Sequence, residues 1–148
     1  MSKEFSPWTI AHTIPSELAA GHRVLDELLA KLSTETWTPR ELFGIRLALE
    51  EAVVNAIKHG NCLDCNKQVD VECRSTADGL WIRVADQGPG FDPEAVPDCT
   101  DPSRLEVPNG RGIMLMRNYM SRVEYNACGN VVVMEKHRAA SSSRPTRA

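Results

Sequence analysis

The sequence lacks the features of a membrane protein, a nucleic-acid-binding protein and a P-loop enzyme. No apolar run approaches the roughly 20 residues that a membrane span needs. The formal net charge is -3 and the pI is about 5.8, so there is no basic footprint for nucleic acid. A P-loop lysine pattern is absent as well. The first residues do not resemble a signal peptide, and we therefore expect a cytoplasmic protein without a membrane or nucleic-acid partner.

The number of cysteines does not suggest a disulfide framework. Five cysteines are an odd number in a chain without an export signal, so free thiols are expected. Cys62 and Cys65 form one Cys-x-x-Cys, but a zinc site would need two more ligands at suitable spacing. The other candidates show no such pattern: Cys73, Cys99, His59 and His137. Structural zinc or redox chemistry stays open as the less favoured alternative.

The length and composition fit one globular domain. A chain of 148 residues can bury a real core, and 42% hydrophobic with 25% charged residues is ordinary for such a domain. From Ala139 onward the residues are small, Ser-rich and basic. We therefore expect one domain over 1–138 and a disordered tail over 139–148.

Alternating apolar and polar residues predict several strands. The runs lie at 4–14, 68–74, 80–85, 123–127 and 131–134. Asp78-Gly79 and Gly129-Asn130 are typical hairpin turns, so the runs that flank each of them should be antiparallel neighbours.

Helical spacing predicts two helices before the first hairpin. Leucines at steps of three and four indicate one helix that opens near Pro15 and ends at about Ser33. Thr38 fits the N-cap of a second helix, with Pro39 at its first position and Glu41 as the reciprocal capping-box residue.

The second helix should run to about His59 and stop at Gly60, with two different faces. One face is an apolar stripe: Leu42, Ile45, Leu49, Val53 and Ala56. On the opposite face lie Glu51, Asn55 and Lys58, below the small residues Gly44 and Ala48. Plain solvation is the simplest interpretation of this face. The functional alternative is a site in which the Asn55 amide oxygen binds Mg²⁺ and Glu51 orients or deprotonates a nucleophile.

The stretch Asp86-Gln87-Gly88-Pro89-Gly90-Phe91 places a carboxylate where a predicted strand ends. Asp86 could accept hydrogen bonds from a buried amino group there. Gly88 and Gly90 leave room for a flat ligand against the backbone. An ordinary Pro-Gly turn is the alternative interpretation.

The segment 92–108 shows no periodicity, which is typical of a functional lid or a mobile loop. Asn109-Gly110-Arg111-Gly112 closes it, just before a helical run of Ile113, Met116, Met120 and Val123. Backbone N–H groups and the dipole at such a helix start favour a phosphate group. A glycine-rich turn with methionines as core residues is the alternative.

Three stretches now stand in order: Glu51-x-x-x-Asn55 on a helix, Asp86-x-Gly88-x-Gly90 after a strand, and Gly110-x-Gly112 before a helix. Together they resemble the GHKL ATPase superfamily, which includes gyrase-type topoisomerases and sensor histidine kinases. The run from Glu50 to Gly60 is similar to the small anti-sigma factor serine kinases, and so is the run from Gly110 to Met116. The resemblance extends from about Ile10 to Lys136.

This resemblance implies a fold and roles for single residues. The fold would be a Bergerat-type α/β (α+β) two-layer sandwich, with helices on one face of a mixed, mostly antiparallel sheet. Glu51 would be the general base, Asn55 would bind Mg²⁺, and Asp86 would accept the adenine amino group. The residues expected to contact ATP are Asn55, Lys58, Asp86, Gly88, Gly90, Phe91, Asn109, Gly110, Arg111 and Gly112.

The resemblance also implies activity and partners. Such a kinase binds a sigma factor and phosphorylates a serine on a small antagonist protein, and relatives often dimerise. Asn109 stands where a relative often has glycine, and Asn130 where many carry threonine near the adenine. No phosphoacceptor-histidine helix precedes the ATP-binding part, which argues against a complete sensor histidine kinase. A non-catalytic, nucleotide-dependent binding module and an ATPase without a protein substrate remain as alternatives.

Overall fold

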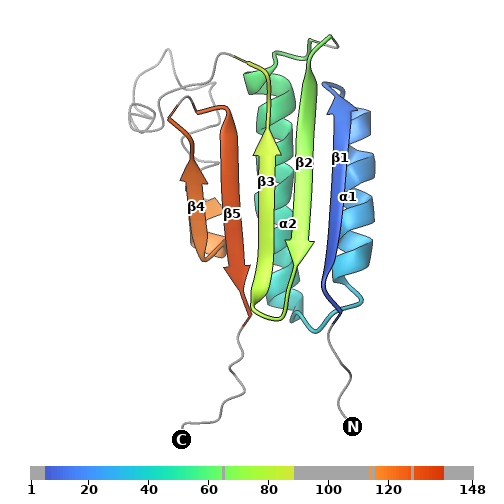
Figure 1. Cartoon of the computed structure of the whole chain (residues 1–148), viewed down its shortest axis with the longest axis vertical. Coiled ribbons are helices and arrows are strands. Elements are labelled where there is room, and N and C mark those ends of the chain that lie inside the picture. Colours follow the sequence, from blue (N-terminus) through green and yellow to red (C-terminus); the bar gives the residue numbers. More distant parts are fainter. Residues whose placement is uncertain (1–5, 65, 89–113, 115, 128, 139–148) are drawn as a thin grey trace, which may run out of the picture.

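Antiparallel strands build one sheet in the computed structural model, which describes residues 6–64, 66–88, 114, 116–127 and 129–138. The elements within these residues are β1 (Trp8–Pro15), α1 (Leu18–Leu32), α2 (Pro39–Val54), η1 (Asn55–Gly60), β2 (Gln68–Ser75), β3 (Gly79–Ala85), β4 (Arg122–Tyr125) and β5 (Val131–His137). The five described strands lie in the order β1-β2-β3-β5-β4, and each pairing among them is antiparallel. Figure 1 shows the sheet from its open side.

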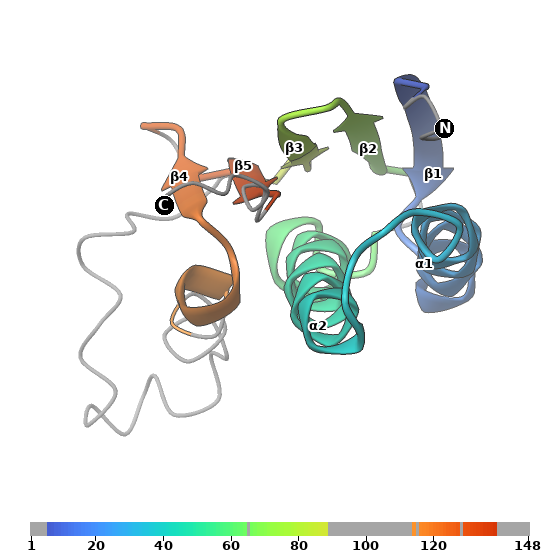
Figure 2. The same cartoon turned by 90° about the horizontal axis from the view of Figure 1, so that it is seen from below.

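Both long helices cover the same face of the sheet, α1 below β1 and α2 below the middle strands (Figure 2). Alternation along the strands explains this arrangement. In β2, Val69 and Val71 are buried against the helices, while Asp70 and Glu72 lie on the opposite face. The predicted two-layer sandwich is therefore confirmed. The two predicted hairpins are confirmed as well.

The start of α2 follows the predicted capping box. The Glu41 N–H donates to Thr38 Oγ1 over 3.0 Å, and the Thr38 N–H donates to Glu41 Oε1 over 2.9 Å. Such a cap stabilises a helix by about 1 kcal/mol. The apolar stripe of this helix is buried as expected at Ile45 and Leu49.

The end of this helix differs from the prediction in the kind of helical turn that it forms. Helical structure does reach Gly60, but its last turn is the π-helix η1, in which the Asn61 N–H donates to the Ala56 carbonyl over 2.9 Å. An i→i+5 turn is wider than an α-turn, so it changes which side chains share a face. The prediction placed Lys58 on the face of Glu51 and Asn55 from α-helical spacing. Lys58 is exposed in the structure, and its contact with ATP remains a prediction.

Gly44, a small residue of α2, is buried against the helical residues 116–119. A Cβ on Gly44 would lie 2.7 Å from Tyr119 Cδ1, and the residues 116–119 are helical. This stretch lies on the same side of the sheet as α2 (Figure 2). The face that begins with Gly44 and Ala48 is therefore packed against protein, and plain solvation does not describe it. The helical run ends before Val123, which lies in β4.

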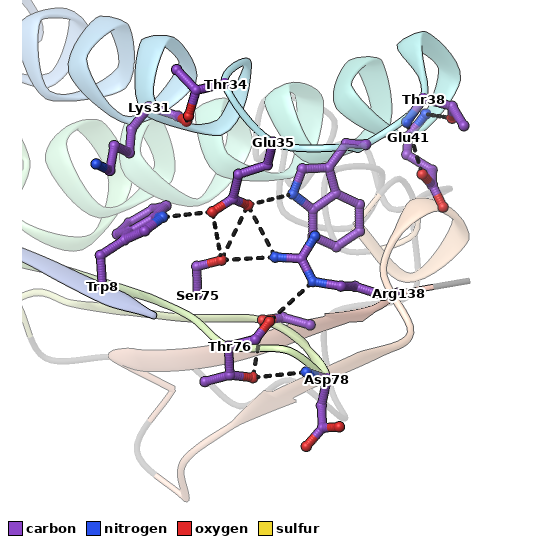
Figure 3. A network of polar contacts seen from close by, with 12 residues as sticks. Trp8, Lys31, Thr34, Glu35, Thr38, Glu41, Ser75, Thr76, Asp78 and Arg138 are labelled. Carbon is purple, nitrogen blue, oxygen red and sulfur yellow. Dashed lines mark hydrogen bonds and ion pairs between the residues drawn. The ribbon is translucent and has the colours of Figure 1, made fainter. Parts of the chain in front are cut away.

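A polar cluster closes the end of the sheet at the β2–β3 hairpin (Figure 3). Glu35 accepts hydrogen bonds from Trp8 Nε1 at 2.6 Å, Trp37 Nε1 at 3.0 Å and Arg138 Nη2 at 3.0 Å. The Ser75 hydroxyl also donates to it, and the Arg138 guanidinium lies 4.5 Å from the centre of the Trp37 ring. Burial alone would raise the pKa of Glu35, but these four donors together lower it.

Within the described residues, no helix combines the length and apolarity that crossing a bilayer would require. The loop 92–108 and the tail 139–148 lie outside the described residues, so both remain predictions.

Candidate functional site

A pocket lies at the upper end of the sheet in Figure 1, between η1 and the ends of β3, β4 and β5. About 480 Å³ of space lies between the lining residues, and this figure includes open solvent at the mouth of the pocket. The described residues that line it are Ala52, Asn55, Ala56, His59, Gly60, Val84, Asp86, Tyr125, Gly129, Asn130 and Val132. The structure thus brings together Asn55 and Asp86, two residues that the sequence predicted for one site.

Asp86 is held in place by its backbone and by its own side chain. Its N–H donates to the Asn130 carbonyl over 2.9 Å, and its Oδ1 accepts the Gly88 N–H over 2.8 Å. Burial raises the pKa of Asp86, while the Gly88 N–H and the charge of Lys67 oppose this rise. No described residue donates to Asp86 Oδ2, so this oxygen can accept a hydrogen bond from an amino group of a ligand.

Gly60 and Gly88 let two backbone segments, the end of η1 and the residues after β3, meet around that carboxylate. A Cβ on Gly60 would lie 2.7 Å from Asp86 Oδ1, and a Cβ on Gly88 would run into the Gly60 carbonyl oxygen. Any larger residue would push Asp86 out of place. Gly88 was expected to shape the pocket. Gly60 was predicted only as a helix stop, so its contact with the site was missed.

Asn55 has a buried amide without a partner. Neither Nδ2 nor Oδ1 is exposed, and neither makes a hydrogen bond to any described residue. An unpaired buried polar group costs about 1–3 kcal/mol, so a native protein rarely keeps one without a reason. A ligand that supplies a donor, or a cation that takes the amide oxygen, would remove this cost.

Glu51 lies one turn before Asn55 and is half-buried, but it is not among the described residues that line the pocket. Burial raises the pKa of Glu51, and the charge of Glu50 adds to this rise. The nearby Asn55 amide opposes it, although the two side chains do not reach hydrogen-bonding geometry. A carboxylate with a raised pKa is a stronger base than an ordinary glutamate.

Tyr125 lines the pocket together with Asn55 and Asp86. Burial raises the pKa of its hydroxyl, and the negative charges of Glu51 and Asp86 raise it further. The charges of both carboxylates therefore act on the Tyr125 hydroxyl. No local pattern predicted this, because Tyr125 was simply one apolar position of a predicted strand.

Ala56, His59 and Gly60 are the residues of η1 after Asn55 that line the pocket. His59 lines it, while Lys58 is exposed and does not. Burial lowers the pKa of His59, and the positive charge of Lys58 lowers it further. A neutral imidazole at this position can pack against a ligand without adding charge.

Asn130 fixes the wall opposite η1. Its Nδ2 donates to the Gly88 carbonyl over 3.2 Å, and its Oδ1 accepts from Asn126 Nδ2 over 3.0 Å. The Asn126 side chain in turn accepts three backbone N–H groups of the turn, those of Gly129, Asn130 and Val131. The position singled out as a departure from the family pattern is therefore part of the pocket wall.

Six of the predicted ATP contacts lie outside the described residues: Gly90, Phe91, Asn109, Gly110, Arg111 and Gly112. They remain predictions. Cys65 also lies outside them, while Cys62 is exposed with a φ of 55°. In the described part of the chain, no group of three or more His, Cys, Asp or Glu side chains could hold a metal ion.

Comparison with known proteins gives one family and several relatives. A model described as the histidine kinase-like ATPase domain matches residues 14–136. The Anti-sigma F factor of Clostridium perfringens strain SM101 is 32% identical over 106 residues, which are 67% of this chain and 74% of that protein. The Anti-sigma F factor of Oceanobacillus iheyensis is 31% identical over 112 residues, 72% of this chain and 76% of that protein. The serine/threonine-protein kinase BtrW of Bordetella bronchiseptica is 26% identical over 93 residues, 62% of this chain and 66% of that protein.

Proposed function

The chain belongs to the histidine kinase-like ATPase domain family, and from this we propose that it is an ATP- and Mg²⁺-dependent protein-serine kinase that also acts as an anti-sigma factor. An ATPase domain of this family implies ATP binding. The finer parts of the proposal concern the phosphoryl acceptor, the metal ion and the protein partners.

The observation that carries the proposal is the shared pocket of Asp86 and Asn55. Within the described part of the chain, Asp86 is a half-buried carboxylate with one oxygen that accepts no hydrogen bond, and Asn55 is a buried amide without a partner. Gly60 and Gly88 bring the backbone up to the carboxylate. An adenine amino group suits Asp86, and the far end of the same nucleotide would then extend toward Asn55 and Glu51.

The residues present also suit a magnesium ion. Mg²⁺ prefers oxygen ligands, keeps several waters and needs only one or two ligands from the protein. Asn55 Oδ1, which accepts no hydrogen bond within the described residues, can supply one of them. When bound, the ion would neutralise charge on the phosphates.

Glu51 would be the general base of the transfer. It would take the proton of a serine hydroxyl as the serine oxygen bonds to the γ-phosphorus. The bond from that phosphorus to the β–γ bridging oxygen breaks, and ADP leaves with its electron pair. Positioning should supply most of the rate in such a reaction. The raised pKa of Glu51 suits this role.

The partner part of the proposal rests on the relatives. Two of them bear the name Anti-sigma F factor, and a third is called a serine/threonine-protein kinase. We therefore propose a sigma factor and a small antagonist protein as competing partners of this chain, the second being the substrate.

One observation favours a second candidate, a non-catalytic module that uses ATP only to control partner binding. Glu51 does not line the pocket among the described residues, and Lys58 is turned outward. Both candidates need a bound nucleotide, so nucleotide affinity alone does not separate them.

Two matched variants separate the candidates. A kinase predicts that Glu51→Gln keeps ATP affinity within about twofold while serine phosphorylation falls at least about 100-fold, as expected for the loss of a general base. Asp86→Asn should lose ATP affinity itself. Calorimetry with Mg²⁺ and ATP gives the first quantity, and transfer from labelled ATP to a candidate antagonist gives the second. If the wild-type chain binds ATP and never forms phosphoserine, the kinase part is wrong. If it binds no adenine nucleotide, the whole proposal is wrong.

A further inference from the structure

Asn61 is a buried polar residue that the proposed chemistry does not use. It follows η1 directly, and its exposed fraction is 0%. Unlike Asn55, it satisfies its amide with protein partners. Its Nδ2 donates to Ser16 Oγ over 2.8 Å and to the Gln68 carbonyl over 2.9 Å, and its Oδ1 accepts the Gln87 N–H over 2.8 Å.

The bond to Gln87 is the one that bears on the site. Gln87 lies between Asp86 and Gly88, and it has left the regular strand β3. The N–H of Asp86 is held from the other side by the Asn130 carbonyl. Two successive N–H groups are therefore held by two different segments, one by the turn before β5 and one by Asn61.

The remaining bonds of Asn61 anchor it to parts of the fold that do not touch the pocket. Ser16 lies in the turn between β1 and α1, and its hydroxyl also donates to the Lys67 carbonyl over 2.8 Å. Gln68 begins β2, and its N–H donates to Gln87 Oε1 over 2.7 Å. Asn61 is thus held by the turn before α1 and by β2 while it holds the Asp86 loop.

We propose that Asn61 is a positioning residue of the nucleotide site: it fixes the backbone of Gln87 so that the Asp86 carboxylate stays between Gly60 and Gly88. This inference rests on the proposed function, because it concerns affinity for an adenine nucleotide. Tight contact around Asp86 makes the position sensitive, since Gly60 and Gly88 leave no space in which the carboxylate could shift and still accept the Gly88 N–H.

The first measurement is made without nucleotide. Hydrogen exchange of the Gln87 amide, followed by NMR, should speed up about tenfold in Asn61→Ala, which corresponds to the loss of one buried hydrogen bond. The amides of β3 should keep their protection. In Ser16→Ala, Asn61 loses one anchor but keeps its bonds to the Gln68 carbonyl and the Gln87 N–H, so the Gln87 amide should exchange close to the wild-type rate.

The second measurement is ATP affinity by calorimetry in the presence of Mg²⁺. Asn61→Ala should weaken ATP binding about tenfold, by the same loss of one hydrogen bond. Ser16→Ala should stay within about twofold, although both variants lose buried hydrogen bonds. Asn61→Asp keeps an oxygen for the Gln87 N–H and should recover most of the affinity. If the alanine variant does not fold, Asn61→Leu replaces it, because leucine removes the same acceptor oxygen and has a similar size.

The outcomes separate this inference from the proposed function. A folded Asn61→Ala that exchanges Gln87 and binds ATP as the wild type does would overturn the positioning role. So would an equal loss of affinity in Ser16→Ala, because this would indicate general destabilisation. If the wild type itself binds no ATP, the proposed function is wrong and the nucleotide role of Asn61 is wrong with it, whereas the exchange result still decides whether Asn61 orders the loop.

Discussion

Gly60 and Asp86 are in contact across the pocket, and a Cβ on Gly60 would come within 2.7 Å of Asp86 Oδ1. Gly60→Ala should therefore displace the carboxylate and weaken ATP binding about tenfold or more, because Asp86 is the proposed partner of the adenine amino group. Calorimetry with Mg²⁺ and ATP measures this effect.

A control for the glycine replacement is Gly21→Ala in α1. Its Cβ would also be close to neighbours, 2.8 Å from Ile57 Cδ1, but this atom is the end of a flexible side chain and the pocket is not involved. Thermal stability can change in this variant, whereas ATP affinity should not. Equal losses of affinity in both variants would contradict the role of Gly60.

The raised pKa of Glu51 predicts how phosphorylation depends on pH. The rate should rise with pH as Glu51 loses its proton, with a midpoint above the ordinary glutamate range of about 4.3. A pH–rate profile with saturating ATP and a candidate antagonist tests this. The low-pH limb should disappear from the residual rate of Glu51→Gln. A limb that persists in that variant would assign the titration to another group.

Arg138→Ala should destabilise the fold without changing the nucleotide site. The variant leaves the carboxylate of Glu35, which is 10% exposed, without its cation. Removing one partner of such a pair costs about 2–3 kcal/mol of unfolding free energy. Denaturant unfolding measures the loss, and ATP affinity should stay within about twofold. Arg122→Ala is the control, because its ion pair with Glu124 is exposed and its loss should leave the unfolding midpoint unchanged. A midpoint in Arg138→Ala equal to that of the wild type would contradict the stabilising role.

The lowered pKa of Glu35 predicts an acid-dependent share of stability. Four donors lower this pKa against the effect of burial, so the folded state favours the charged carboxylate. The stabilisation is then present above the ordinary glutamate pKa of about 4.3, and it is lost as pH falls through the lower folded-state pKa. Glu35→Gln should be less stable than the wild type near neutral pH, and the difference should shrink in acid. Unfolding curves of both proteins from neutral to acidic pH test this, and a constant difference would contradict it.

Local signals in the sequence were sufficient for most of the fold. Period-two alternation predicted the strands, and Thr38 with Glu41 predicted the start of α2, because alternation and capping depend on neighbours within a few residues. The end of the same helix could not be predicted in type. Whether the turn from Asn55 to Gly60 is α or π depends on what packs around it, which helical spacing does not record.

The site was predictable in its residue types and less so in its contacts. The sequence motifs around Asn55 and Asp86 predicted that both lie at one site, and both line the same pocket. Gly60 and Tyr125 were missed as site residues because their roles arise from distant segments that meet only after folding. Asn61 gave no signal either, because an asparagine after a helix is ordinary as a local pattern.

The Glu35 cluster and the Asp86 pocket lie at opposite ends of β3, whose seven residues span about 20 Å. Substitutions that far apart usually add independently in their effects on free energy. To obtain a more heat-resistant version of this domain, the residues around Glu35, including Trp8 and Trp37, can therefore be redesigned with melting temperature as the only screen. Improvements found there should transfer unchanged to variants whose ligand preference has been altered at the other end.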